Sequence, residues 1–338
     1  MENEPDKTAD EKWLKDLPLR SENIGFQPEE MKTCPKCGKA NPPTRPACFY
    51  CLAGLEIAES ADNIGKLERR VLETWENGFN IIYLPGLSML RTPDISLIAR
   101  YLSVEADLLK SVLECESPMP IARLESETEA AAAVELLSNA GLVCRTVSDA
   151  ALRADKLPVR LRALEFRDGC LILTVFNTNE KREVPTHEIL LIVTGTIFES
   201  KTETVEKRKK KEQKILFETQ TSNDGALIDI YTKDEPNGYR ISIKGFDFSC
   251  LGAEMGLVAG ENIGRLIAVL KNWASEAKFV SDYNAARELL DTIWETERRK
   301  DTSGLQPAGF GGAEVIKIES SNNLQQFTKY SRLQRNLL

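Results

Sequence analysis

The sequence predicts a multidomain α+β protein, and three observations lead to that class. Two cysteine pairs lie close together in CPKCGKANPPTRPACFYC, residues 34–51. Strand-like and helical runs alternate from 79 to 148, whereas short β-branched runs fill 159 to 245 and two amphipathic helical patterns follow them. A chain of 338 residues, 42% of them hydrophobic, is long enough for two or three domains with cores of their own.

Charge and the start of the chain bear on location and partners. The formal net charge of -8 and the pI near 5.2 disfavour attraction of the whole molecule to nucleic acid or to an anionic membrane. No apolar run reaches the roughly 18–20 residues of a membrane-spanning helix, so we expect no transmembrane segment. The start, MENEPDKTADEKW, lacks the basic and apolar regions of a secretory signal, so we expect a cytoplasmic protein. Residues 1–30 are charged and aperiodic, which predicts a flexible N-terminal segment.

The cysteine pairs form the strongest motif. Cys34 and Cys37 make one Cys-x-x-Cys turn, and Cys48 and Cys51 make the second. Two such turns supply the tetrahedral four-sulfur shell that suits Zn²⁺, and four thiolates leave no open position for catalysis. The motif therefore predicts one structural zinc ion, with two disulfides, a redox dithiol and an iron–sulfur site as the alternatives.

The residues around these cysteines follow the pattern CPxCGxxNPxxxxxCxxC. Besides the four cysteines, the pattern is matched by Pro35, Gly38, Asn41 and Pro42. In this respect residues 31–56 resemble the short bacterial zinc ribbons, and the resemblance implies a zinc ion held by the four cysteines. The chain departs from that family after the second turn, where Leu52 and Ala53 precede Gly54.

The segment after the ribbon, residues 57–77, is predicted to be a linker helix. Ile64, Leu67, Val71 and Trp75 recur at helical spacing, and Asn77-Gly78 ends the pattern.

Residues 78–152 are predicted to form a small module with the order β-α-α-β-α-β. Its clearest helix lies in SETEAAAAVELLSNAG, where Ser126 and Glu129 form a capping box and Gly141 ends the helix. In this order, and in the runs LSVEADLLKSVLE and SETEAAAAVELLSNAGLVCRTV, residues 79–148 resemble the C-terminal domain of the ribosomal stalk protein. That resemblance implies recruitment of translation factors, and the alternative is an α+β module with a different partner or none. Here, however, Ser103, Val104 and Leu108 replace the glycine and lysine residues of that family's factor-binding helices.

Residues 156–300 are predicted to form an antiparallel β-rich domain with C-terminal helices. The strand-like runs are VRLRALEF, CLILTVF, EILLIVTGTIF, KILFET, ALIDIYT and YRISIKG, and the helical patterns cover 261–274 and 282–298. Strands closed by such a helix make 159–275 resemble a pleckstrin-homology-like barrel, with an independent sheet-plus-helix fold as the alternative. Residues 301–338 have little periodicity and are predicted to form a mostly irregular tail.

Other chemistry-bearing residues point to no second site. His187, the single histidine, lies in VPTHEILL and is interpreted as a loop or strand-edge residue. Cys115, Cys144, Cys170 and Cys250 are interpreted as packed free thiols. The basic run EKRKKKEQK, 206–214, is predicted to be a solvated hairpin loop, with contact to a polyanion such as RNA or a lipid surface as the alternative.

The sequence therefore favours a non-enzymatic protein, a zinc-ribbon adaptor or regulator that mediates macromolecular interactions through an unidentified protein partner. The second hypothesis is a nucleic-acid-binding or ribosome-associated protein that uses the ribbon and the basic run. An enzyme is the third class, and the sequence offers no catalytic constellation for it. The identity of the partner and the oligomeric state do not follow from the sequence.

Overall fold

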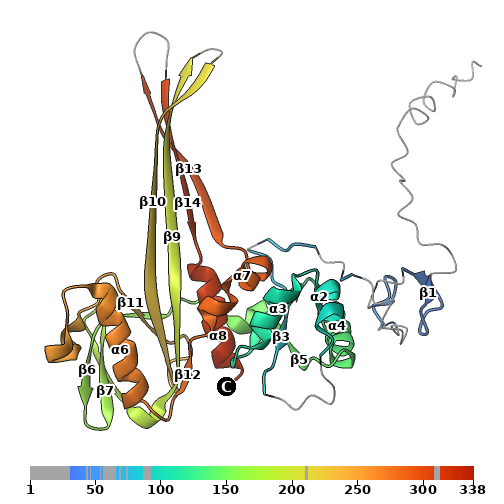
Figure 1. Ribbon diagram of the computed structural model, residues 1–338, viewed down its shortest axis with the longest axis horizontal. Helices are drawn as coiled ribbons and strands as arrows, with labels where there is room; N and C mark the ends of the chain where they lie inside the picture. Colours follow the sequence, from blue (N-terminus) through green and yellow to red (C-terminus); the bar gives the residue numbers. More distant parts are fainter. Residues whose placement is uncertain are drawn as a thin grey trace, which may run out of the picture.

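A computed structural model describes residues 31–42, 45, 47–53, 55, 66–67, 70–73, 75–86, 93–209, 212–307 and 313–338. The predicted flexible segment, residues 1–30, lies outside these residues. Two lobes stand at the foot of a long β arm, and the small cysteine-bearing ribbon lies beside the lobe that follows it in the chain (Figure 1). No helix in the part of the chain that is described has the length and apolar character needed to cross a bilayer.

The described residues of the ribbon and of the segment after it contain little regular structure. Strands β1 (Lys32–Thr33) and β2 (Ala40–Asn41) pair antiparallel in the ribbon. The predicted linker helix is wrong where it can be checked, because residues 66–67, 70–73 and 75–77 contain no helix, and residues 57–65 lie outside the described residues.

The module explains why this segment is not helical. The backbone N–H of Leu67 donates to the carbonyl of Tyr101 at 2.8 Å, and the guanidinium of Arg123 donates to the carbonyl of Leu72 at 3.3 Å. Backbone groups that would bond within a helix are therefore bonded to the module. Trp75, expected on the apolar face of the helix, is 77% exposed.

The module has the predicted order of elements. It comprises β3 (Phe79–Tyr83), α2 (Ile95–Leu102), α3 (Ala106–Leu113), β4 (Met119–Leu124), α4 (Glu127–Asn139) and β5 (Cys144–Ser148), and the short helix α5 (Asp149–Leu152) follows. Strand β3 lies between β4 and β5, antiparallel to both. The predicted cap of α4 is confirmed, since the hydroxyl of Ser126 accepts a hydrogen bond from the backbone N–H of Glu129 at 3.2 Å.

The second lobe is built on a large sheet. Its strands are β6 (Val159–Arg167), β7 (Cys170–Val175), β8 (Lys181–Pro185), β9 (Ile189–Lys209), β10 (Glu212–Thr232), β11 (Tyr239–Ser242) and β12 (Lys278–Val280). The sheet is mixed, because β11 pairs parallel with β6 and β12 pairs parallel with β9. The expectation of a wholly antiparallel sheet is therefore wrong. Alternation of apolar residues reports which face of a strand is buried, and it carries no information on the direction of the neighbouring strand.

Both predicted helices are present, the first packed on the sheet of this lobe and the second packed on β4 and α3 of the module. These are α6 (Ala259–Trp273) and α7 (Tyr283–Ile293), and the 3₁₀ turns η3 (Thr186–Glu188) and η4 (Phe248–Glu254) complete the connections.

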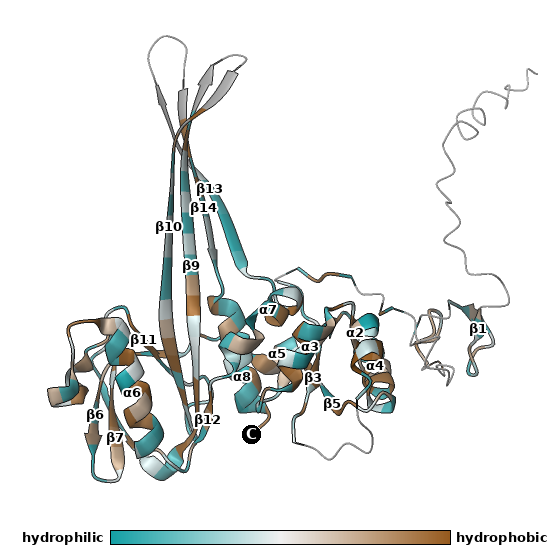
Figure 2. Cartoon of the chain, viewed as in Figure 1, coloured by the Kyte–Doolittle hydropathy of each residue, from teal (hydrophilic) through white to brown (hydrophobic). Residues whose placement is uncertain are grey.

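The arm consists of two hairpins that run side by side. Strands β9 and β10 are 21 residues each, and their outer halves extend beyond the lobe (Figure 1). Strands β13 (Glu297–Pro307) and β14 (Ala313–Asn322) form the second hairpin, and β14 pairs with the outer half of β9. Figure 2 shows β9 and β10 changing from hydrophobic at the lobe to hydrophilic along the arm. Most described side chains of β13 and β14 are exposed or half-buried, so these two strands lack a clear buried face, which is why they were missed in the sequence.

The prediction of an irregular tail is wrong, since the chain from 313 onward forms β14 and a central helix, α8 (Leu324–Asn336). Every residue of α8 from Gln326 to Gln334 is buried. Its polar side chains bond to both lobes, with Arg332 donating to the carbonyl of Lys156 at 2.9 Å and Gln334 donating to that of Pro118 at 2.7 Å. One continuous apolar core contains Ile81 of the module, Leu191 of β9 and Tyr330 of α8, so the two lobes pack as one body.

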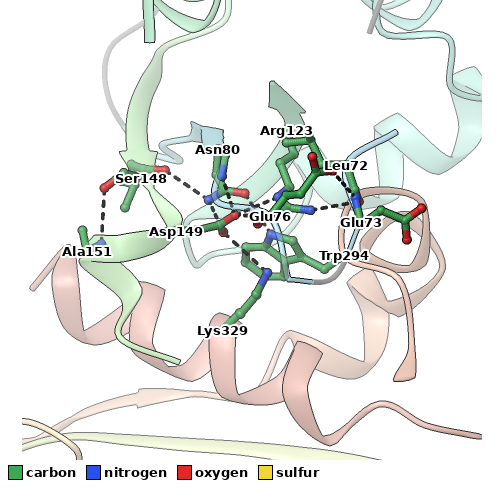
Figure 3. Close-up of polar contacts among 12 residues, drawn as sticks. Leu72, Glu73, Glu76, Asn80, Arg123, Ser148, Asp149, Ala151, Trp294 and Lys329 are labelled. Carbon is green, nitrogen blue, oxygen red and sulfur yellow. Dashed lines mark hydrogen bonds and ion pairs between the residues drawn. The ribbon is translucent and has the colours of Figure 1, made fainter. Parts of the chain in front are cut away.

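A buried polar network lies where α8 meets the module (Figure 3). Asp149 accepts hydrogen bonds from the backbone N–H of Gly78 at 2.9 Å, from Asn80 at 3.0 Å and from Arg123 at 2.8 Å, and it lies 3.5 Å from the ammonium of Lys329. The indole N–H of Trp294 donates to Asn80 at 2.8 Å. Burial by itself would raise the pKa of Asp149, but these positive and donor groups outweigh burial and hold the pKa below its usual range.

Candidate metal centre

The two Cys-x-x-Cys turns have the same backbone geometry. In the first, the N–H of Gly38 donates to the carbonyl of Cys34 at 2.8 Å; in the second, the N–H of Leu52 donates to the carbonyl of Cys48 at 2.9 Å. Gly38 has φ +70° and Leu52 has φ +58°. Leu52 thus has the left-handed backbone conformation that Gly38 has in the first turn. The second turn of this chain differs from the zinc-ribbon pattern in having Leu52 at that position.

The four thiols converge on one point. The Sγ atoms of Cys34 and Cys51 are 3.5 Å apart, as are those of Cys37 and Cys48, and all four lie within 4.8 Å of one another. A tetrahedral shell with Zn–S distances of about 2.3 Å requires sulfurs about 3.8 Å apart. A disulfide would require about 2.05 Å. The four cysteines therefore lie within metal-binding distance and are consistent with a zinc site.

Asn41 forms hydrogen bonds that connect the two turns of the cysteine cluster. Its side chain is fully buried, and its amide nitrogen lies 3.4 Å from the sulfur of Cys48 and donates to the carbonyl of Lys39 at 2.8 Å. Its amide oxygen accepts from the backbone N–H of Phe49 at 2.8 Å. Asn41 therefore joins the two turns and donates toward a ligand sulfur, a role that the sequence signalled only through its place in the pattern.

The electrostatics of the cluster favour a cation. Burial by itself raises the pKa of Cys48, but the N–H groups of Tyr50 and Cys51, with Cys37 and Asn41, bring it to about 6. The pKa of Cys37 rises to about 12, because burial and the neighbouring sulfurs outweigh the hydrogen bond with the backbone of Lys39, which lowers it. Four adjacent thiols do not all ionise by themselves, and a divalent cation is the group that lets them do so.

The second turn projects two aromatic rings into solvent. Phe49 is 65% exposed and Tyr50 is 55% exposed, and their rings meet edge to face with centroids 5.5 Å apart. The ammonium of Lys39 lies 4.2 Å from the centroid of Tyr50, and the guanidinium of Arg45 lies 5.2 Å from that of Phe49. We call Lys39, Arg45, Phe49 and Tyr50 the aromatic patch. Both rings therefore project outward rather than cover the cysteine cluster.

The aromatic patch is anchored to the module through Arg45. Its guanidinium forms an ion pair with Glu129 of α4 at 3.2 Å. The same side chain therefore contacts the ring of Phe49 and the module, which limits how the patch can turn relative to the rest of the chain.

The other residues singled out in the sequence lie outside the cysteine cluster. Within the described residues the four cysteines are the one group of three or more potential metal ligands. His187 is exposed in η3, between β8 and β9, in agreement with the loop interpretation. Burial raises the pKa of Cys115 to about 11 and that of Cys144 to about 12, so both thiols stay protonated at neutral pH.

The basic run lies at the outer end of the arm. Residues 206–209 end β9, residues 212–214 begin β10, and residues 210–211 lie outside the described residues. The run joins two paired strands as predicted, but the strands continue through most of the run. The sequence placed a loop here because the run is so highly charged, and it missed the arm that carries it.

No protein-family model matches the chain, and no curated protein or solved structure is significantly similar to it. The resemblances to the stalk protein and to a pleckstrin-homology-like barrel therefore stay predictions. The predicted metal site in the ribbon is supported by the geometry of the four cysteines.

Proposed function

We propose that the protein is a non-enzymatic adaptor whose zinc ribbon presents the aromatic patch to a protein partner. The observation that carries this proposal is the joint exposure of Phe49 and Tyr50, each with a cation against its ring. Aromatic and arginine side chains dominate binding energy at protein interfaces. Exposed rings that are already ordered lose little conformational freedom when a partner covers them.

A single structural zinc ion completes the proposal. Cys34, Cys37, Cys48 and Cys51 hold the ion, and zinc fits this donor set better than a harder cation because all four ligands are thiolates. A ribbon this short buries little apolar surface, since the core of its described residues consists of Cys34, Cys48 and Leu55, with Cys51 and Ala53 packed against them. Metal binding then supplies the folding free energy, which leaves Phe49 and Tyr50 free to face a partner.

The test of the adaptor function compares capture of proteins from a nuclease-treated extract of the native host. The bait is the full chain, either the parent or the Phe49→Ala/Tyr50→Ala double variant, and both must retain zinc. Trp75→Ala is the matched control, because Trp75 is an exposed aromatic outside the patch. We expect a protein that parent and control capture and the double variant loses, by at least about tenfold. Equal capture by all three baits would remove the ribbon from the binding surface.

Binding to nucleic acid is the second candidate function, and one observation favours it. Lys39 and Arg45 each pair with an aromatic ring, and this combination also stacks on bases and contacts phosphates. The basic run at the end of the arm would add phosphate contacts. Anisotropy of a labelled single-stranded RNA at about 50 mM and about 200 mM salt separates the candidates, since contacts with phosphate weaken steeply with salt. Absence of binding at the lower salt concentration rejects the second candidate.

A further inference from the structure

A cavity of about 350 Å³ lies at the root of the arm, far along the chain from the ribbon. Strands β9, β10 and β11 form its walls, together with the start of β6 and of α8. Its apolar lining comes from Leu157, Ile197, Leu227, Ile243 and Leu324. The volume is at the lower end of the range of small-molecule sites, about 300–1,000 Å³, and those sites share this mainly apolar lining.

Three cations line the same cavity, and two of them are neutralised. Lys244 pairs with Glu199 at 2.5 Å. Arg240 forms two hydrogen bonds of 2.7 Å with the carboxylate of Asp229. These ion pairs neutralise Lys244 and Arg240. Arg160 is the remaining cation of the lining.

Arg160 is held in place without a carboxylate. Its guanidinium donates to the backbone carbonyl of Lys244 at 2.5 Å and lies 3.8 Å from the ring centroid of Phe176. Among the residues that the structure describes, no Asp or Glu forms an ion pair with it. A positioned guanidinium whose charge is uncompensated is suited to a carboxylate or another oxyanion, which it binds through charge-assisted hydrogen bonds.

We infer that this cavity binds a small amphipathic anion. The apolar body of the ligand lies against Leu227 and Ile243, and its oxyanion bonds to Arg160. The size of the cavity limits the ligand to a small molecule, and the charge of Arg160 selects an anion over a cation of the same shape. This site is independent of the aromatic patch, so either can fail without the other.

The first experiment is calorimetric titration of the full chain with decanoate. Decyltrimethylammonium, which has the same alkyl chain and the opposite charge, is the comparison ligand. We expect saturable binding of one decanoate per chain and binding of the cation at least about tenfold weaker. Absence of decanoate binding, or equal binding of the two probes, would overturn the inference.

Substitutions on the cavity wall then test whether decanoate binds in this cavity. A Cβ at Gly225 would have one neighbour within 4 Å, the side chain of Ile243 at 3.5 Å, so Gly225→Phe adds a ring on the cavity wall without a clash at its Cβ. Gly264 of α6 has nothing within 4 Å of an added Cβ, which makes Gly264→Phe the matched control. We expect Gly225→Phe to lose decanoate binding and the control to keep it. Unchanged binding by Gly225→Phe would mean that decanoate lies elsewhere.

Arg160→Gln supplies a test that removes the charge and leaves the apolar lining of the cavity unchanged. Arg160 is exposed, so its substitution leaves the core intact. We expect decanoate to bind at least about tenfold more weakly, while decyltrimethylammonium binds as it does to the parent. Circular dichroism of each variant confirms that the fold is retained. Equal decanoate affinity in parent and Arg160→Gln would reject the assigned role of the guanidinium.

Discussion

Leu52 and Asn41 illustrate how single residues define the ribbon. Leu52 carries the left-handed backbone that closes the second turn, and Asn41 bridges the two turns from a fully buried position. The sequence predicted a metal site at the four cysteines because two Cys-x-x-Cys turns supply a four-sulfur shell, and the structure brings these four cysteines within metal-binding distance. The sequence could not assign a role to Asn41, because a hydrogen bond from a side chain to a sulfur depends on how the two turns face each other.

Leu52→Gly is expected to stabilise the ribbon by about 0.5–1 kcal/mol, because glycine adopts a positive φ without the steric cost of a β-carbon. The measurement is a zinc competition titration with a chromophoric chelator, in which the variant should hold zinc more tightly. Leu52→Ala is the control, since it removes the exposed side chain and keeps the β-carbon. A gain in Leu52→Ala as large as that in Leu52→Gly would show that the backbone conformation is not the cause.

Asn41→Ala is expected to weaken zinc binding by about 10–100-fold, because it removes the donor to Cys48 and leaves the N–H of Phe49 without its acceptor. The same chelator titration measures the loss. Lys36→Ala, an exposed neighbour in the first turn, should leave the affinity unchanged. Retention of parental affinity by Asn41→Ala would make the contact with Cys48 incidental.

Among the helices and strands, those whose apolar residues recur with a helical or strand period were predicted from the sequence. Those without such a period were missed. The module and helices α6 and α7 were predicted because each has one buried face. Strands β13 and β14 and helix α8 were missed for two reasons. Most described side chains of β13 and β14 are exposed or half-buried. Helix α8 is surrounded by protein that bonds its polar side chains, such as Arg332 and Gln334. Neither arrangement produces an amphipathic pattern.

Gly195 tests the packing of α7 and α8 on β9. A Cβ at this position would lie 2.6 Å from the ring of Phe327 and 2.7 Å from that of Tyr283. Gly195→Ala should therefore cost about 1–3 kcal/mol of unfolding free energy, measured by urea denaturation. Gly225→Ala, on the paired strand β10, meets only Ile243 at 3.5 Å and should cost much less. Equal stability of the two variants would contradict the close contact of α8 with β9.

At the scale of the molecule, the buried network around Asp149 joins the module to α8. Asp149 and Arg123 come from the module, and Lys329 comes from the last helix. Packing between residues so distant in sequence is the part of the fold that local patterns could not predict. Because the network is shielded from water, a change of charge within it is costly.

Asp149→Asn should destabilise the chain by about 3–5 kcal/mol at neutral pH, because Arg123 and Lys329 lose their buried countercharge. The pH dependence has a definite sign. The pKa of Asp149 is lowered in the folded state, so its contribution is present above the unfolded-state value of about 3.9 and is lost as the pH falls through the folded-state pKa. Urea denaturation between about pH 6 and pH 3 should show a shallower loss in the variant than in the parent. If the unfolding free energies of parent and variant fell equally with pH, Asp149 would not be the source of this pH dependence.

We propose that the four cysteines hold one structural zinc ion and that this ion orders the aromatic patch. Elemental analysis of protein purified without chelators tests it most directly, with Cys37→Ser as the comparison. The account predicts one zinc per chain in the parent, and loss of that zinc in Cys37→Ser with the two lobes still folded by circular dichroism. A parent chain with no stoichiometric zinc, or with iron in its place, would contradict the claim.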